Sequence, residues 1–166
     1  AIIGLGQIGR EVAKRANAFG LVVKAFDKIY DKSFCEDNKI LFSNVLEETV
    51  NACDYISIHL PLNNYTKGLI SEDIIQNHLL PGCIIVNTAR AGVVHLASIL
   101  TGLEHGAIGG YLTDVLEKEP MEENHPLLKY KNVIITPHIG SRTYESVERQ
   151  GIMAVDNLAK MLSGAG

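Results

Sequence analysis

The chain has 166 residues, of which 46% are apolar and 20% are charged, a composition typical of a soluble globular protein. Its formal net charge of −4 argues against a nucleic-acid partner, because phosphate backbones are bound by clustered lysines and arginines. No apolar stretch is long enough to cross a membrane, so no membrane partner is expected. The three cysteines are scattered, which predicts reduced thiols and a cytoplasmic location. No histidines have metal-ligand spacing alongside carboxylates, so no metal site is expected.

Strand-like and helical patterns alternate along the whole chain. Several of the strand-like runs are continuously apolar, as a parallel sheet covered on both faces requires. Strands are expected at 1–5, 21–26, 55–60, 83–87, 108–115 and 133–136, and helices at 8–19, 45–53, 71–79, 94–104 and 143–162. This order predicts an α/β fold in which a doubly wound, Rossmann-type parallel sheet forms the middle of three αβα layers, in one domain over residues 1–166.

The first turn is rich in glycine and carries the pattern GxGxxG between a strand and a helix. Gly4 permits the tight turn, Gly6 lets the backbone approach a pyrophosphate, and Gly9 allows close packing of helix and strand. The free N–H groups of the helix N-terminus would then face the phosphates. Gln7 and Ile8 complete the predicted phosphate-binding loop. The motif alone is weak, but its context is right on both sides.

Asp27 stands at the end of the second expected strand, eighteen positions after Gly9. A carboxylate there can accept hydrogen bonds from the adenosine ribose and repel a 2′-phosphate, which predicts NAD rather than NADP. The alternative is a solvated loop carboxylate. Lys28 beside it slightly weakens the preference for NAD, because a lysine could accommodate a phosphate.

Three further segments follow later strands, where open α/β sheets bind their ligands: VNTARAG at 86–92, TDVLEKEP at 113–120 and NVIITPHIG at 132–140. With these motifs in this order, the chain closely resembles the D-isomer-specific 2-hydroxyacid dehydrogenases over essentially its whole length. The resemblance implies an NAD-dependent oxidoreductase that transfers a hydride between the cofactor and a small 2-hydroxy or 2-oxo acid.

The same resemblance implies a catalytic set of Arg90, Glu119 and His138. The chemistry agrees, since oxidation of a hydroxy acid needs a base, and a neutral histidine suits this role near neutral pH. A paired glutamate would orient the imidazole, and an arginine would bind the substrate carboxylate. Taken singly, each residue could instead be a surface or loop residue. The formate branch of the family carries glutamine where Glu119 stands, so glutamate favours a hydroxy-acid substrate.

Other positions carry over from the family as cofactor contacts. Leu60 and Pro61 would line the adenine side, with Thr66 nearby. Thr88, Ala89 and Arg90 would lie near the nicotinamide, and Asp114 beside its carboxamide.

The family's substrate domain is not visible in this chain, which is therefore expected to be a cofactor domain that binds NAD but turns over poorly alone. The resemblance also implies a homodimer. An alternative from another class is an NAD-sensing interaction module like the C-terminal-binding-protein corepressors, which keep the same three residues. A third is dinucleotide binding without chemistry, which would require Arg90, Glu119 and His138 not to converge.

Overall fold

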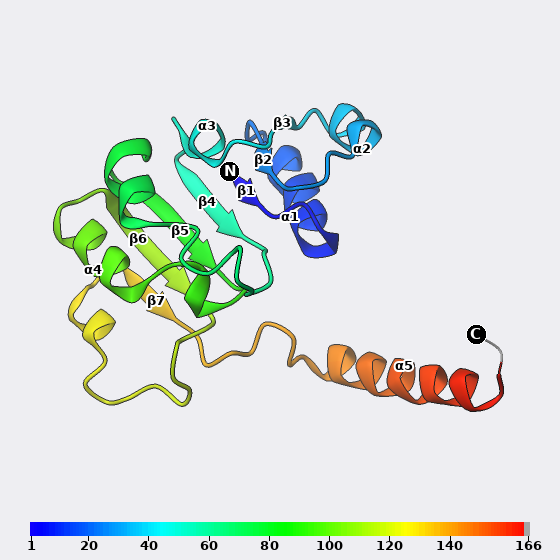
Figure 1. Ribbon diagram of the computed structural model, residues 1–166. Coiled ribbons are helices and arrows are strands. Elements are labelled where there is room, and N and C mark those ends of the chain that lie inside the picture. The colour runs from blue at the N-terminus through cyan, green and yellow to red at the C-terminus, as the bar shows by residue number, and fades with distance from the viewer. Residues whose placement is uncertain (165–166) are drawn as a thin grey trace.

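The computed structural model describes residues 1–164 and contains a seven-stranded sheet (Figure 1). All neighbouring strands are parallel, in the order β3-β2-β1-β4-β5-β6-β7. The strands are β1 (Ile2–Ile3), β2 (Lys24–Phe26), β3 (Leu41–Ser43), β4 (Tyr55–Ile58), β5 (Cys83–Asn87), β6 (Ile108–Thr113) and β7 (Val133–Ile135). The α-helices are α1 (Gln7–Ala18), α2 (Lys32–Asp37), α3 (Leu46–Val50), α4 (Leu96–Glu104) and α5 (Tyr144–Leu162). Shorter helical turns are η1 (Ile74–His78), η2 (Ala91–Val93) and η3 (Pro126–Lys129).

Helices pack on both faces of the sheet and produce two apolar clusters. The larger cluster joins the sheet to α3, η1 and α4, and the smaller one joins it to α1 and α2. Successive residues of a strand point to opposite faces, so Ile2 belongs to the smaller cluster and Ile3 to the larger. The predicted three-layer, Rossmann-type architecture is confirmed. On β5, however, Ile84 and Val86 are only half-buried, so one face is less covered than the apolar runs predict.

The order in which successive strands are added to the sheet reverses at β1. The strands β2 and β3 extend to one side of it, and β4 to β7 extend to the other. In such sheets the crevice outside the carboxyl ends of the strands, at this reversal, is where ligands bind. The glycine turn after β1 and the loops after β4 and β5 therefore meet at the expected ligand edge.

Two elements lie where the sequence pattern predicts none. Strand β3 has only three residues, and its partner contacts are confined to β2 at the edge of the sheet. The short helix α2 begins after Asp31, whose side chain accepts a hydrogen bond from the N–H of Phe34. Both elements are too short to show a periodic sequence pattern. Helix α2 is recognised by its N-cap, and strand β3 by its pairing with β2.

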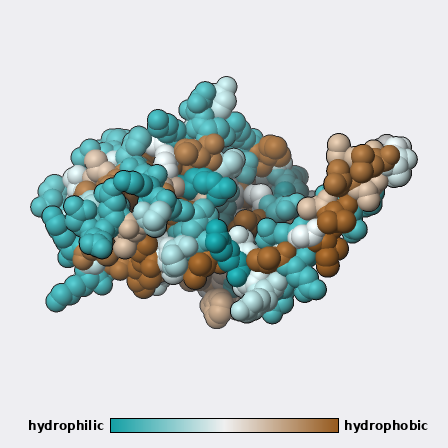
Figure 2. Space-filling model, turned by 90° about the horizontal axis from the view of Figure 1, so that it is seen from below, coloured by the Kyte–Doolittle hydropathy of each residue, from teal (hydrophilic) through white to brown (hydrophobic). Residues whose placement is uncertain are grey.

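The last helix, α5, projects away from the sheet (Figure 1). It begins after Thr143, whose hydroxyl accepts from the N–H of Ser146, and none of its residues is buried. Apolar side chains are exposed along this arm (Figure 2), among them Val147, Leu158 and Met161. The predicted helix is confirmed, but within residues 1–164 its apolar stripe is not packed on the sheet. No helix in this range is long and apolar enough to span a membrane.

Candidate active site

The glycine turn brings the start of α1 very close to the end of β1. A Cβ atom at Gly9 would lie 1.9 Å from the carbonyl oxygen of Gly4, so only glycine allows this approach. Gly4 has a φ of +100°, which a side chain would strain. In contrast, the space around Gly6 is open, with no atom within 4 Å of a Cβ placed there. Gly6 is also the N-cap of α1, so the free N–H groups of the first helical turn adjoin this open space.

Asp27 lies beside this turn and holds it. One carboxylate oxygen accepts from the N–H of Leu5 at 2.6 Å, and the other accepts from the N–H of Ile29 at 3.1 Å. The ammonium of Lys28 is 4.6 Å from the centre of the Tyr65 ring, a cation–π contact that occupies the lysine. A carboxylate thus stands at the end of β2, and its contact with a ribose stays a prediction.

One pocket gathers most of the other predicted cofactor residues. It is lined by Ile8, Leu60, Pro61, Thr88, Ala89 and Arg90, together with His59 and Leu62. The guanidinium of Arg90 donates to the carbonyl oxygen of Ala89 at 2.6 Å. These residues come from the start of α1 and from the loops after β4 and β5, so the pocket lies at the reversal point of the sheet.

Thr66 has a different position from the rest of this set. Its side chain is 5% exposed, and its hydroxyl donates to the carbonyl of Pro61 at 2.6 Å. The same hydroxyl accepts from the N–H of Asn63 at 2.9 Å. Thr66 thus closes its own loop, and its contact with a cofactor stays a prediction.

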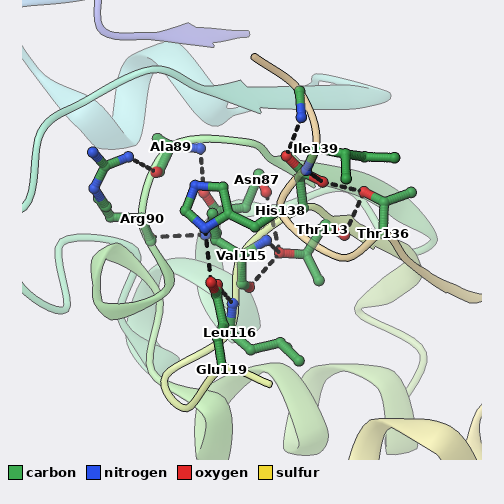
Figure 3. Close-up of polar contacts among 12 residues, drawn as sticks. Asn87, Ala89, Arg90, Thr113, Val115, Leu116, Glu119, Thr136, His138 and Ile139 are labelled. Carbon is green, nitrogen blue, oxygen red and sulfur yellow. Dashed lines mark hydrogen bonds and ion pairs between the residues drawn. The ribbon is translucent and has the colours of Figure 1, made fainter. Parts of the chain in front are cut away.

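His138 and Glu119 meet at the ends of the next two strands (Figure 3). Nδ1 of His138 lies 2.8 Å from Oε2 of Glu119, and both side chains are partly exposed. The N–H of Leu116 donates to the other oxygen of Glu119 at 2.9 Å. This hydrogen bond and then that of His138 hold the pKa of Glu119 below its ordinary value, so the carboxylate is charged at neutral pH.

Asp114 holds the loop that carries His138 through hydrogen bonds to its carboxylate. One oxygen of this carboxylate accepts from the N–H of Ile139 at 2.9 Å and from the hydroxyl of Thr136, and the other accepts from the N–H of Gly140 at 2.8 Å. Burial alone would raise the pKa of Asp114, but these hydrogen bonds outweigh it and the pKa is lowered. His138 itself has a φ of +54°, a conformation that is strained outside glycine. The three hydrogen bonds stabilise this strained loop.

The predicted catalytic residues are therefore on three adjacent loops. Arg90 follows β5, Glu119 follows β6 and His138 follows β7, and these strands are neighbours in the sheet. Their side chains share one edge of the sheet with the glycine turn. Glu119 and His138 are in direct contact, whereas Arg90 lines the pocket described above, together with Leu60 and Ala89. Within residues 1–164, no cluster of three or more histidines, cysteines and acidic residues could hold a metal ion.

Comparison with known proteins decides the family. The model described as "D-isomer specific 2-hydroxyacid dehydrogenase, NAD binding domain" matches residues 1–140. The chain belongs to this family. The open space at Gly6, the helix N-terminus and the carboxylate of Asp27 fit the pyrophosphate and ribose of NAD, the family's cofactor.

Similar family members include enzymes with different substrates. The chain is 35% identical to a D-3-phosphoglycerate dehydrogenase of Methanocaldococcus jannaschii, over 98% of this chain and 31% of that protein. It is 34% identical to a glyoxylate reductase of Korarchaeum cryptofilum, over 98% of this chain and 48% of that protein. A crystal structure of D-lactate dehydrogenase from Aquifex aeolicus, complexed with NAD and lactic acid, matches 98% of the chain and 53% of its own length, with a TM-score of 0.88 and 29% identity. The chain thus spans about half the length of these dehydrogenases, or less.

Sequence reasoning did not single out the buried residues that support the site. Asn87 is 0% exposed, and its side chain contacts the turn that carries Arg90. Thr113 and Thr136 link the ends of β5, β6 and β7 through their hydroxyls. The available signal was the polar residue at the end of each otherwise apolar strand, because a buried polar group must find a hydrogen-bonding partner.

Proposed function

We propose that the protein containing this chain is an NAD-dependent dehydrogenase that interconverts a small D-2-hydroxy acid and the corresponding 2-oxo acid. The observation that carries this proposal is the 2.8 Å pair of His138 and Glu119, on loops adjoining the one that bears Arg90. The dehydrogenase and reductase names of its relatives favour this function over a corepressor-like interaction module.

His138 would transfer the proton. Because Glu119 is ionised, the ring nitrogen Nδ1 carries the hydrogen and donates it to the carboxylate, which leaves Nε2 with its lone pair. In oxidation, Nε2 accepts the proton of the substrate hydroxyl, and in reduction the imidazolium returns it to the oxygen of the 2-oxo group. In oxidation, bound NAD would accept the hydride that leaves the carbon bearing this hydroxyl. Glu119 orients the ring and stabilises the imidazolium as it forms.

Arg90 would bind the other end of the substrate. A guanidinium offers two parallel N–H donors, which match the two oxygens of a carboxylate. Its present partner is the carbonyl oxygen of Ala89, a hydrogen bond that a substrate carboxylate would replace with a charge-assisted pair. Arg90 and His138 would then hold a 2-hydroxy acid by its carboxylate and its hydroxyl, and so fix the carbon between them.

Several further properties belong to this proposal. The enzyme would prefer NAD over NADP because of Asp27, would act in the cytoplasm and would form a homodimer. The residues 1–166 would be its cofactor domain, with the substrate domain supplied elsewhere. Without that domain, the substrate is not positioned and water is not excluded, so the chain alone should bind NADH but reduce 2-oxo acids poorly.

The test is a substrate screen with the full-length protein. We expect NADH oxidation with at least one of glyoxylate, pyruvate, hydroxypyruvate and phosphohydroxypyruvate, and slower reaction with NADPH. The variant His138→Gln should lower kcat by about 10²- to 10⁴-fold while it still binds NADH. His105→Gln, a histidine at the end of α4, is the matched control and should react normally. Absence of reduction of every 2-oxo acid, despite NADH binding, would refute the proposal.

A further inference from the structure

The side chain of Asn87 lies inside the turn that carries Arg90 (Figure 3). Asn87 is the last residue of β5 and is 0% exposed. Its Oδ1 accepts from the N–H of Ala89 at 3.1 Å, and its Nδ2 donates to the carbonyl oxygen of Arg90, also at 3.1 Å. A single carboxamide therefore bridges the two residues that follow Thr88.

The backbone of Asn87 is fixed separately to the neighbouring strand. Its carbonyl oxygen accepts from the hydroxyl of Thr113 and from the N–H of Asp114, both at 3.1 Å. The same Nδ2 lies 3.4 Å from the hydroxyl of Tyr111, a buried residue of β6. The backbone of Asn87 is thus attached to β6, and its side chain holds the turn of Arg90.

We propose that Asn87 is a positioning residue that sets the place of Arg90 relative to His138. Arg90 precedes η2 and has an extended backbone, at φ −148° and ψ 138°, and the residue is exposed. Such a side chain has many rotamers, so the direction of its reach depends on where its backbone is held. Asn87 supplies that attachment, and Asp114, which directly follows the neighbouring strand β6, supplies the corresponding one for the His138 loop. This role rests on the proposed function.

A carboxamide meets both requirements of this turn, because its oxygen accepts and its nitrogen donates. The N–H of Ala89 needs an acceptor, and the carbonyl of Arg90 needs a donor. An aspartate offers acceptors alone, so it would face the carbonyl of Arg90 with a charged oxygen. A leucine of similar size would leave both groups without a partner. In either case the turn must shift to reach water, because a buried polar group without a partner is unfavourable.

The test is a double-mutant cycle in the full-length protein, with kcat/KM for the preferred 2-oxo acid as the readout. Asn87→Asp alone should lower kcat/KM about 10- to 100-fold, the size of effect that a misplaced catalytic group produces. In an Arg90→Ala background, the same change should lower it less than twofold further, because Asn87 acts through Arg90. Ile85→Val, a fully buried substitution on the same strand, is the matched control and should leave kcat/KM unchanged.

Losses that multiply in the double variant would make Asn87 merely structural and overturn the proposal. Should Asn87→Asp fail to fold, Thr113→Val removes the hydroxyl that contacts the carbonyl oxygens of Asn87 and Val115, and it should give a smaller loss with the same dependence on Arg90. Hydrogen exchange of the Ala89 amide tests the bridge without activity, and it should be slow in the wild type and faster in Asn87→Asp. A wild-type protein that reduces no 2-oxo acid would overturn the proposed function and the positioning role together, whereas an active one with multiplying losses overturns only the latter.

Discussion

The substitutions Gly9→Ala and Gly6→Ala separate two tasks of the glycine turn. At Gly9 a methyl group would lie 1.9 Å from the carbonyl oxygen of Gly4 and 3.0 Å from its carbon, so the backbone must move. Forcing extra volume into a packed site costs about 1–3 kcal/mol. The better helix propensity of alanine returns less than about 1 kcal/mol of that. We therefore expect Gly9→Ala to lower the free energy of unfolding by about 1–2 kcal/mol, which lowers Tm by roughly 2–8 °C for a domain of this size.

Gly6→Ala should leave stability nearly unchanged, because its methyl group would meet no atom within 4 Å. That open space is where the pyrophosphate is proposed to lie, so the affinity for NADH should fall at least tenfold. Thermal unfolding and NADH titration of both variants check the pair. The expected pattern is lost affinity in both variants and lost stability in Gly9→Ala alone. A Gly6→Ala variant that binds NADH as tightly as the wild type would refute the placement of the phosphates.

Three other changes test the surroundings of the site. Asp114→Asn should lower kcat and reduce the free energy of unfolding by about 2 kcal/mol, because an amide cannot accept all the hydrogen bonds of the carboxylate. The pKa of Asp114 is lowered in the folded protein, so its stabilisation is present above about pH 4 and is lost as the pH falls through the folded value. Urea unfolding at several pH values should show the difference between variant and wild type shrinking in acid, and a constant difference would contradict this. Asp27→Asn should weaken NADH binding and narrow the preference over NADPH, and an unchanged ratio of the two dissociation constants would count against its ribose role. Burial raises the pKa of Cys83 to about 11 and raises that of Cys35, so with Cys53 also buried a thiol reagent at neutral pH should label the protein only after unfolding.

The glycine turn and the residues after each strand were predictable because their chemistry depends on local sequence. Gly9 is required by a backbone contact five residues away, and His138 lies in the loop that follows a strand the apolar pattern already reveals. Once the strands are known to be parallel and adjacent, their carboxyl ends must meet at one edge. The pairing of Glu119 with His138 was expected from the resemblance to the family, and the adjacent parallel strands explain why their loops meet.

Other features depend on contacts that no local pattern carries. Strand β3 is recognisable only by its pairing with β2, and α2 is shorter than two helical turns. The apolar stripe of α5 predicts a helix correctly but does not say where that helix lies. Thr66 matches a cofactor position by sequence, and its hydroxyl also closes a loop, a partner that the local sequence does not reveal.

The glycine turn and the loops that carry Arg90 and His138 are held in place in different ways. The glycine turn, where the phosphates are proposed to lie, is built from backbone, so its requirements appear in the sequence as glycines. The proposed catalytic residues are exposed side chains on loops, and these would be mobile without attachment. The buried polar residues at the ends of β5 and β6, Asn87 and Asp114, each tie one such loop to the sheet. Exposed side chains such as Arg90 and His138 can therefore stay in place while they remain accessible from solvent. Substitution of either anchor should impair turnover more than an equally destabilising change in the apolar core, because only the anchors transmit the geometry of the sheet to Arg90 and His138.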